Sequence, residues 1–335
     1  MKKYLFFVMI AVMAFSACKK NNGDDDNGND NPSDSNSNNP KVVDVYVAGR
    51  DGNIAVLWKN GVAQNLSNEI NYAGAYSVFV YGNDVYVAGY EGNIAKLWKN
   101  GIAQNLTDGT FPSKANSVFV SSNGVYVVGY ESTVEREPNT SYNFAPCIAK
   151  LWKNGEAINL TNGTRIAEAK SVYVSENDIY VVGSDGYTPK LWKNGIDQNL
   201  SGISYVYSVC ASGNDVYVAG TSAYICGSSG CGFRPLLWKN GEAQDLGGMA
   251  YVYSVFVSEN DVYVTGSDGN VGKLWKNGVE QNIYGISYAK SVYVLDNDIY
   301  LAGKSGKSAQ LWKNGRVQTL TDGKNDAEAY SVFVK

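Results

Sequence analysis

The stretch "SVFVYGNDVYVAGYEGNIAKLWKNGIAQNL" (residues 77–106) contains four short runs of strand-forming residues separated by turn residues. The runs are "SVFV", "NDVYVAG", "NIAKLW" and "AQNL". Runs of four to six apolar or β-branched residues bounded by Asn, Asp and Gly are typical of β-strands. Asn-Gly separates the third and fourth runs, and it favours a tight hairpin because both turn positions need a positive φ. The stretch therefore predicts four short antiparallel strands.

The same unit recurs along the whole chain from Val42 onward. The word "LWKNG" contains all seven tryptophans of the protein, which are Trp58, Trp98, Trp152, Trp192, Trp238, Trp275 and Trp312. Four antiparallel strands repeated seven times, without helical periodicity, predict an all-β fold, a seven-bladed β-propeller. A β-solenoid or an open β array is the alternative, but it would need polar capping units and would tolerate any number of repeats.

The two ends of the array complement each other. The array begins with a second-strand word, "VVDVYVAG" (residues 42–49), and ends with a first-strand word, "SVFVK" (residues 331–335). We therefore expect the C-terminal strand at 331–334 to pair beside 43–48 and to complete a mixed blade. That pairing would close the ring and leave neither end with an unpaired strand edge.

The repeats resemble those of the propeller superfold in general, such as tryptophan-aspartate-repeat and kelch proteins. The resemblance covers residues 42–335 and concerns architecture alone, because "LWKNG" lacks the Gly-His and Trp-Asp signature of the former. What all units share is needed to build a blade. On that reasoning the tryptophans pack between blades, and the lysine of each "WKNG" is a solvated turn residue.

The N-terminal segment has the pattern of an export signal. Residues 1–17 combine a basic start with an apolar run, and "FSAC" (residues 15–18) resembles the lipobox of bacterial lipoproteins of the Bacteroidota type. The resemblance implies cleavage before Cys18 and lipidation of that cysteine, which would be the only contact with the membrane. Residues 18–41 are rich in Asn, Asp and Ser and predict a disordered tether. The expected location is the outer membrane, with the domain at residues 42–335 exposed at the cell surface.

Composition excludes several classes of function. The chain has no histidine, which removes the commonest general base and the usual zinc ligand. Its formal net charge is −4, and it has no basic stripe, so nucleic acid is not an expected partner. No cluster has metal-ligand spacing and no phosphate-binding or dinucleotide motif fits its context, so we expect no metal and no cofactor.

Two sets of variable residues are candidate ligand-binding positions. The first set directly precedes each "SVFV" word and would encircle the mouth of the central channel: Tyr76, Asn116, Lys170, Tyr207, Tyr253, Lys290 and Tyr330. The second set follows the glycine of the second strand and would form an outer ring, in which Arg50, Tyr90 and Tyr130 are the candidates. Tyrosines and lysines in a ring suit a polar ligand or a loop of a partner protein. The alternative is that the tyrosines merely cover the core at the blade ends.

Both large insertions lie between second and third strands, on the face opposite the hairpin turns. They span residues 130–147 and 221–235. Cys226 and Cys231 close a short Gly/Ser loop in the second insertion, so we expect a disulfide there. Cys210 is interpreted as a small buried hydrophobe and Cys147 as a free thiol.

These observations favour a monomeric, non-enzymatic binding protein that presents one propeller face to a glycan or a protein. A polysaccharide hydrolase or lyase is the second hypothesis. It needs unique acidic groups at the channel, and Glu131, Glu135 and Glu137 are the only acids near it that fall outside the repeat pattern. A third hypothesis, a structural envelope protein without a small ligand, predicts a channel plugged by its own side chains.

Overall fold

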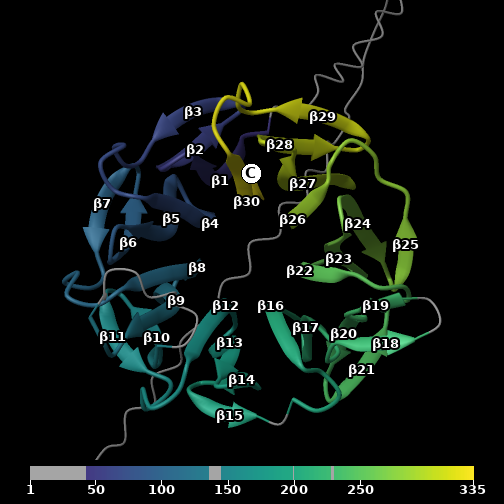
Figure 1. Cartoon of the computed structure of the whole chain (residues 1–335), viewed down its shortest axis with the longest axis horizontal. Helices are drawn as coiled ribbons and strands as arrows, with labels where there is room; N and C mark the ends of the chain where they lie inside the picture. The colour runs from purple at the N-terminus through teal and green to yellow at the C-terminus, as the bar shows by residue number, and fades with distance from the viewer. Residues whose placement is uncertain (1–42, 136–144, 199, 228–229) are drawn as a thin grey trace, which may run out of the picture. The chain divides into compact units, whose positions relative to one another are not determined.

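The computed structural model describes residues 43–135, 145–198, 200–227 and 230–335, and these form seven four-stranded antiparallel sheets arranged as blades around a central axis (Figure 1). Residues 1–42, which include the expected signal, Cys18 and the tether, lie outside the described residues. In the described part of the chain, no helix is long and apolar enough to cross a membrane.

The blades follow the chain in order. Blade 1 contains β1 (Val45–Asp51), β2 (Ile54–Lys59), β3 (Val62–Asn65) and β30 (Ala327–Val334). Blade 2 contains β4 (Ala73–Tyr81), β5 (Asp84–Glu91), β6 (Ile94–Lys99) and β7 (Ile102–Asn105), and blade 3 contains β8 (Ser113–Ser121), β9 (Gly124–Ser132), β10 (Cys147–Lys153) and β11 (Glu156–Asn159). Blade 4 contains β12 (Ala167–Ser175), β13 (Asp178–Asp185), β14 (Thr188–Lys193) and β15 (Ile196–Gln198).

The remaining three blades have the same plan. Blade 5 contains β16 (Tyr205–Ser212), β17 (Asp215–Thr221), β20 (Pro235–Lys239) and β21 (Glu242–Asp245), with a small hairpin of β18 (Ile225–Gly227) and β19 (Gly230–Gly232) inserted between β17 and β20. Blade 6 contains β22 (Tyr251–Ser258), β23 (Asp261–Asp268), β24 (Val271–Lys276) and β25 (Val279–Gln281). Blade 7 contains β26 (Tyr288–Leu295), β27 (Asp298–Ser305), β28 (Ser308–Lys313) and β29 (Arg316–Thr319).

The C-terminal strand closes the ring, as the sequence predicts. β30 pairs antiparallel with β1 over seven residue pairs, from Val45 opposite Val334 to Asp51 opposite Ala327. Two backbone hydrogen bonds extend the pairing by one more residue pair. Asp44 N–H donates to Lys335 O at 2.8 Å, and Lys335 N–H donates to Asp44 O at 2.9 Å. The first and last segments of the chain therefore share one blade, beside which β28 and β26 of blade 7 lie (Figure 1).

The core is divided among seven seams between neighbouring blades. Each seam contains the tryptophan of one blade packed against the tyrosine and leucine of the blade before it; in the first seam Trp98 of blade 2 meets Tyr46 and Leu57 of blade 1. Trp98 is fully buried, and six further clusters repeat the arrangement. The tryptophans thus fill the wedges between blades, where burial of a large ring contributes most to stability.

The innermost strands begin earlier than the "SVFV" words indicate, and each has a β-bulge. In blade 2 the strand begins at Ala73, and the register with β5 shifts between Ala75 and Ser77, so Tyr76 is the extra residue. All seven blades show this shift at the equivalent position. A bulge sets two residues of one strand opposite one of its partner and redirects the extra side chain.

A glycine in the second strand makes the bulge possible. A Cβ atom on Gly89 would lie 2.0 Å from the carbonyl oxygen of Gly74, and in the other six blades the corresponding distance is 1.9 to 2.2 Å. Such an approach is closed to any residue with a side chain. This contact explains why every second-strand word ends in glycine.

Candidate functional site

The hairpin face carries the same polar network in six of the seven blades. In blade 2, Lys99 Nζ lies 2.7 Å from Asp84 Oδ2, and Asn100 Nδ2 donates a hydrogen bond of 2.8 Å to Asp84 Oδ1. Asn100 and Gly101 both have positive φ, 52° and 81°, as the Asn-Gly turn requires. The network lowers the pKa of Asp84, mainly through the hydrogen bond from Lys99. Blade 3 lacks it, since Gly124 replaces the aspartate.

The "WKNG" lysines are accessible to solvent, as the sequence predicts, and in six blades each is also paired with an aspartate, which the sequence analysis did not foresee. The paired aspartates are Asp44, Asp84, Asp178, Asp215, Asp261 and Asp298. Each lysine joins the turn between its blade's last two strands to the start of the second strand, which in blade 1 follows Asp44. A face that repeats one network is suited to building blades and offers no distinctive site.

The opposite face, here called the variable face, is formed by the turns between second and third strands and by the links between blades. The two are held together by backbone hydrogen bonds, such as Gly92 N–H to Tyr72 O at 2.9 Å and Gly186 N–H to Ile166 O at 2.8 Å. Both insertions lie here. This face therefore has the sequence variation that a binding surface needs, on a rigid support.

The seven bulge residues form a ring, here called the inner ring, within the innermost strands. They are Tyr76, Asn116, Lys170, Tyr207, Tyr253, Lys290 and Tyr330, which the sequence analysis expected at the strand entrances. They lie further along the strands than expected, because each strand begins about three residues before its bulge. All seven side chains are partly buried.

Contacts join most inner-ring residues across the seams. The Tyr76 and Tyr330 rings pack edge to face at 5.0 Å, Lys170 Nζ lies 4.7 Å from the Tyr207 ring centroid, and Lys290 Nζ lies 4.0 Å from that of Tyr253. Asn116 Nδ2 donates hydrogen bonds of 2.9 Å to Glu168 Oε1 and Ala169 O. Most inner-ring side chains are thus engaged in contacts with one another or with neighbouring strands. We therefore interpret the inner ring as a support for the residues that lie above it on the variable face.

A second ring, here called the rim, lies two positions before the bulge and was not identified from the sequence. Its members are Gly74, Lys114, Glu168, Tyr205, Tyr251, Tyr288 and Glu328. Tyr205 and Tyr251 are 41% and 46% exposed. The rim position differs in chemical type from blade to blade, because it is glycine, lysine, glutamate or tyrosine. A comparison of "AGAYS", "SKANS" and "AEAKS" (residues 73–77, 113–117 and 167–171) would have shown that this position varies.

An aromatic collar lines the channel below the inner ring. It consists of Phe79, Phe119, Tyr173, Phe256, Tyr293 and Phe333, with Cys210 in the seventh place. Five neighbouring pairs have ring centroids 4.6 to 4.9 Å apart. Cys210 is buried, as expected, and burial raises the pKa of its thiol to about 11. The collar lies along the innermost strands between the inner ring and the hairpin turns.

Three candidates from the outer ring lie close to the inner ring. Arg50 Nε donates a hydrogen bond of 3.0 Å to Tyr330 Oη, and Arg50 also pairs with Asp326. Tyr90 contacts Tyr76 at a centroid distance of 5.4 Å, and burial raises its pKa to about 12. Burial raises the pKa of Tyr130 as well. These hydroxyl groups stay protonated at neutral pH and can donate hydrogen bonds.

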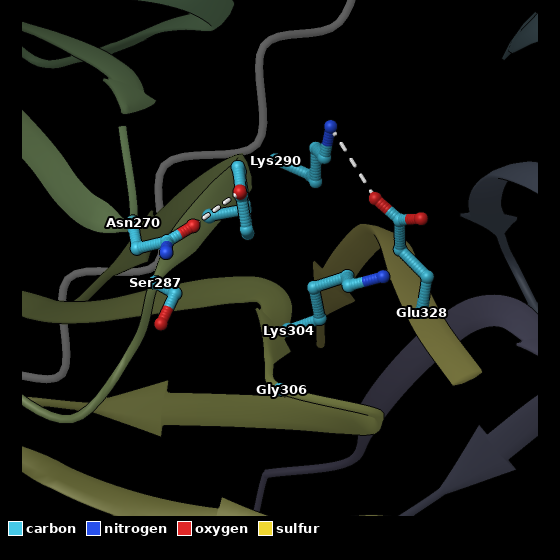
Figure 2. A pocket seen from close by; sticks show the side chains of 7 residues that line it. Asn270, Ser287, Lys290, Lys304, Gly306 and Glu328 are labelled. Carbon is cyan, nitrogen blue, oxygen red and sulfur yellow. Dashed lines mark hydrogen bonds and ion pairs between the residues drawn. The ribbon is translucent and has the colours of Figure 1, made fainter. Parts of the chain in front are cut away.

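One recess on the variable face lies over blade 7 and is bordered by residues of blades 6 and 1. It has a volume of about 390 Å³ and is lined by Asn270, Ser287, Tyr288, Lys290, Lys304, Gly306 and Glu328. Figure 2 shows Lys290 and Glu328 pointing toward each other from neighbouring blades, with 3.3 Å between Nζ and Oε1. Lys304 Nζ lies 3.0 Å from Asp326 Oδ1. The charges in this recess therefore neutralise one another.

A second recess lies between blades 2 and 3 and has a different character. Its volume is about 370 Å³, and it is lined by Ile70, Asn71, Tyr72, Tyr90, Gly92, Asn93, Pro112, Ser113, Lys114 and Tyr130. Three tyrosine rings, amide and hydroxyl groups and one cation share the space. Apolar and aromatic walls with a few polar groups are typical of small-ligand sites. The two outer-ring tyrosines predicted as ligand-binding thus lie in one recess.

The second insertion carries an aromatic cluster centred on Phe233. The rings of Tyr205, Tyr224 and Tyr251 lie 5.5, 5.2 and 5.1 Å from the Phe233 ring. Cys226 is disulfide-bonded, and the register of β18 and β19 places Cys231 opposite it. The pairing of Cys226 with Cys231 stays a prediction.

The first insertion lies partly outside the described residues. Glu137 falls in that part, at residues 136–144. Glu131 is paired with Lys150 on the adjacent strand β10. Cys147 is a free thiol and buried, and burial raises its pKa to about 11. Among the described residues, no three Cys, Asp or Glu side chains are grouped in a way that could hold a metal ion.

Comparison with known proteins finds similar folds but identifies no family for this chain. No protein-family model matches the chain, and no curated protein matches it. An acylaminoacyl peptidase solved with Z-Gly-Gly-Phe-chloromethyl ketone is similar with a TM-score of 0.53 and 15% identity over 84% of this chain and 51% of that one. The acylaminoacyl peptidase of Pyrococcus horikoshii is similar with a TM-score of 0.52, at the same identity and coverage. A structure of a nidogen/laminin complex is similar with a TM-score of 0.43 and 8% identity, over 88% of this chain and 98% of that one.

The likeness is one of fold. This chain spans about half the length of the peptidases it matches. At 15% identity the similarity supports a β-propeller, which is compatible with a binding role, and it carries no activity to this chain.

Proposed function

We propose that this chain is a non-enzymatic binding protein of the bacterial cell envelope, tethered through a lipid on Cys18, whose variable face binds a glycan. The observation that carries the proposal is the tyrosine-lined recess between blades 2 and 3. Tyrosine offers an apolar ring face beside a hydroxyl group, and a sugar likewise alternates C–H faces with hydroxyl groups. The lipobox-like "FSAC" supports the tether, and the polar segment at 18–41 supports a domain held away from the membrane.

A protein partner is the second candidate, and the aromatic cluster around Phe233 favours it. Tyr224 is 59% exposed and Tyr251 46% exposed, although both rings contact Phe233. Exposed aromatic rings gathered in one place are typical of the hot spots of protein interfaces.

The hydrolase or lyase hypothesis gains no support from Glu131, because its carboxylate is paired with Lys150. The collar partly fits the structural hypothesis, because aromatic side chains line the channel. It leaves the recesses of the variable face open, however, and these are what a binding protein needs.

The proposal is tested by glycan-array binding of the full-length chain carrying Cys18→Ser, which takes no lipid. We expect binding to at least one polysaccharide and a loss of tenfold or more when Tyr72, Tyr90 and Tyr130, which line the recess, are all changed to Ala. Tyr81→Ala, at an exposed tyrosine on the hairpin face, is the control and should leave binding unchanged. Binding to no glycan, or unaltered binding by the triple variant, would remove the proposed site.

A further inference from the structure

Lys114 is a cation enclosed by aromatic rings on the rim. It is the second residue of β8, and its Nζ lies 4.5 Å from the centroid of the Tyr90 ring and 5.6 Å from that of Tyr76. It donates a hydrogen bond of 3.3 Å to Tyr76 Oη. Burial lowers the pKa of Lys114, and the negative charge of Glu168 partly opposes this effect. The ammonium group is thus held away from water with only neutral oxygen and ring partners.

Other enclosed cations of the variable face have a carboxylate at ion-pair distance. The pairs are Arg50 with Asp326, Lys96 with Glu91, Lys150 with Glu131, Lys290 with Glu328 and Lys304 with Asp326. Within the described residues, no carboxylate comes within 4 Å of Lys114 Nζ. Glu168 accepts a hydrogen bond from Asn116 instead. Lys170 also lacks a carboxylate partner among these residues, but it lines none of the recesses described above.

Gly74 occupies the rim position of blade 2, next to Tyr90, which lines the recess beside Lys114. A Cβ atom at Gly74 would lie 3.1 Å from Cε1 of Tyr90, and the φ of Gly74 is not in the left-handed region. The reason for glycine here is therefore space and not backbone conformation. Other blades carry glutamate, lysine or tyrosine at this position. Such a side chain in blade 2 would fill the recess or displace Tyr90.

The walls of the recess match one sugar ring. Tyr72 is 50% exposed, so half of its surface is accessible to a ligand, although its ring lies 6.0 Å from that of Tyr90 and the Arg50 guanidinium carbon lies 6.0 Å from its centroid. Asn71, Asn93 and Ser113 supply amide and hydroxyl groups around it. A volume of about 370 Å³ is in the range of small-ligand sites.

We propose that the recess between blades 2 and 3 binds an acidic sugar residue of a polysaccharide, with Lys114 Nζ facing its carboxylate or sulfate group and Tyr72 packing against its ring. The inference rests on the proposed glycan-binding function and names the class of glycan. An anion in the recess would give Lys114 the kind of partner that Arg50, Lys290 and Lys304 already have, and a charge-assisted bond away from water is stronger than an exposed one. An acidic peptide is the less suitable occupant, because the lining side chains match ring and hydroxyl groups.

The test compares acidic and neutral polymers as probes for the full-length Cys18→Ser chain. Isothermal titration calorimetry would measure polygalacturonate against its carboxyl-reduced form, dextran sulfate against dextran, and poly-glutamate as the acidic peptide. We expect at least one acidic polysaccharide to bind tenfold or more tightly than its neutral counterpart and than poly-glutamate. Lys114→Gln should remove this preference and Lys114→Arg should retain most of it. Lys153→Gln is the control and should leave it unchanged, because Lys153 lies on the hairpin face, where its Nζ is 5.5 Å from the Tyr126 ring centroid. Gly74→Glu should abolish binding by filling the recess.

The outcomes separate the two proposals. Equal binding of acidic and neutral polymers, or an unchanged preference in Lys114→Gln, would overturn the acidic-sugar site and leave the glycan-binding function standing. Tighter binding of poly-glutamate would overturn it in favour of a peptide. If no polysaccharide binds at all, the proposed function itself fails. Circular dichroism of each variant, compared with Lys114→Arg, identifies any loss of binding that comes from misfolding.

Discussion

Removal of the last five residues, Ser331–Lys335, tests whether ring closure holds the propeller together. The deletion removes Val332 and Val334, which are 4% and 1% exposed, and Phe333, whose ring contacts Phe79 and Tyr293 across both adjoining seams. It also removes Ser331 Oγ, which accepts a hydrogen bond of 3.2 Å from Val78 N–H. Half of the β1–β30 ladder is lost with them.

The magnitude follows from the balance of burial and chain ordering. Burial of these three apolar side chains contributes about 4 to 7 kcal/mol, and the apolar surface that they cover on neighbouring strands contributes about as much again. Ordering five residues costs about 5 to 8 kcal/mol. The deletion should therefore lower the free energy of unfolding by about 3 to 6 kcal/mol, a large part of the 5 to 15 kcal/mol typical of a folded domain.

Urea unfolding followed by circular dichroism measures this loss. An opened ring has two free ends, so the transition should also become broader, as in linear repeat arrays. Deletion of Lys335 alone is the control and should cost about 1 to 3 kcal/mol, since it removes two backbone hydrogen bonds with Asp44 and the hydrogen bond that Lys335 Nζ donates to Gly82 O. A peptide of residues 327–335 should restore part of the stability by adding the strand back. A shortened chain with the same midpoint and the same slope would refute the closure argument.

Three further predictions, which use five substitutions, test the repeated parts of the blade by thermal or urea unfolding. Gly89→Ala should lower the free energy of unfolding by about 2 kcal/mol or more, because its Cβ would lie 2.0 Å from the Gly74 carbonyl oxygen. Gly74→Ala would meet only the edge of the Tyr90 ring at 3.1 Å and should lower it by less than about 1 kcal/mol. Equal losses would contradict the backbone-contact explanation. The lowered pKa of Asp84 stabilises the fold above about pH 4, near the unfolded pKa, and this contribution is lost as the pH falls through the folded pKa. Asp84→Asn should therefore reduce the loss of melting temperature between neutral and acidic pH. An unchanged pH dependence would show that solvent screens the pair too strongly for it to affect stability. Trp98 Nε1 donates a hydrogen bond of 3.0 Å to Leu66 O, whereas the buried Trp152 Nε1 has no partner. Trp98→Phe should therefore lower the free energy of unfolding by about 1 kcal/mol more than Trp152→Phe. The reverse order would show that the Trp98 hydrogen bond does not stabilise the fold.

The architecture was predictable because each blade repeats one local code. Asn-Gly at positions such as 100–101 fixes the hairpin, and the alternation in "NDVYVAG" sets the faces of the second strand. The closure followed from counting strand words at the two ends. Neither step needed a long-range contact to be known, since four local strands already specify a blade.

The site was less predictable, for two physical reasons. The bulge breaks the alternation of the innermost strand, so "AGAY" (residues 73–76) does not read as strand, and the rim was missed. The pairing of charges also depends on which side chains of neighbouring blades converge. Nothing in the sequence indicates that Glu168 accepts a bond from Asn116 and leaves Lys114 to the tyrosines, because this depends on the geometry of the seam between blades 3 and 4.

The bulge also explains how one face can vary while the fold stays fixed. The bulge is set by a backbone contact, that of Gly89 with the Gly74 carbonyl oxygen, and the adjoining seam is tied by a serine hydroxyl, that of Ser77, which accepts a hydrogen bond of 3.1 Å from Val118 N–H. Neither interaction involves the side chain of the rim residue. The rim position can therefore be glycine, lysine, glutamate or tyrosine without disturbing the tryptophan-filled seams. A ring of such positions lets binding chemistry change one blade at a time, and blades 2 and 3 are where an opened recess and an unneutralised cation coincide.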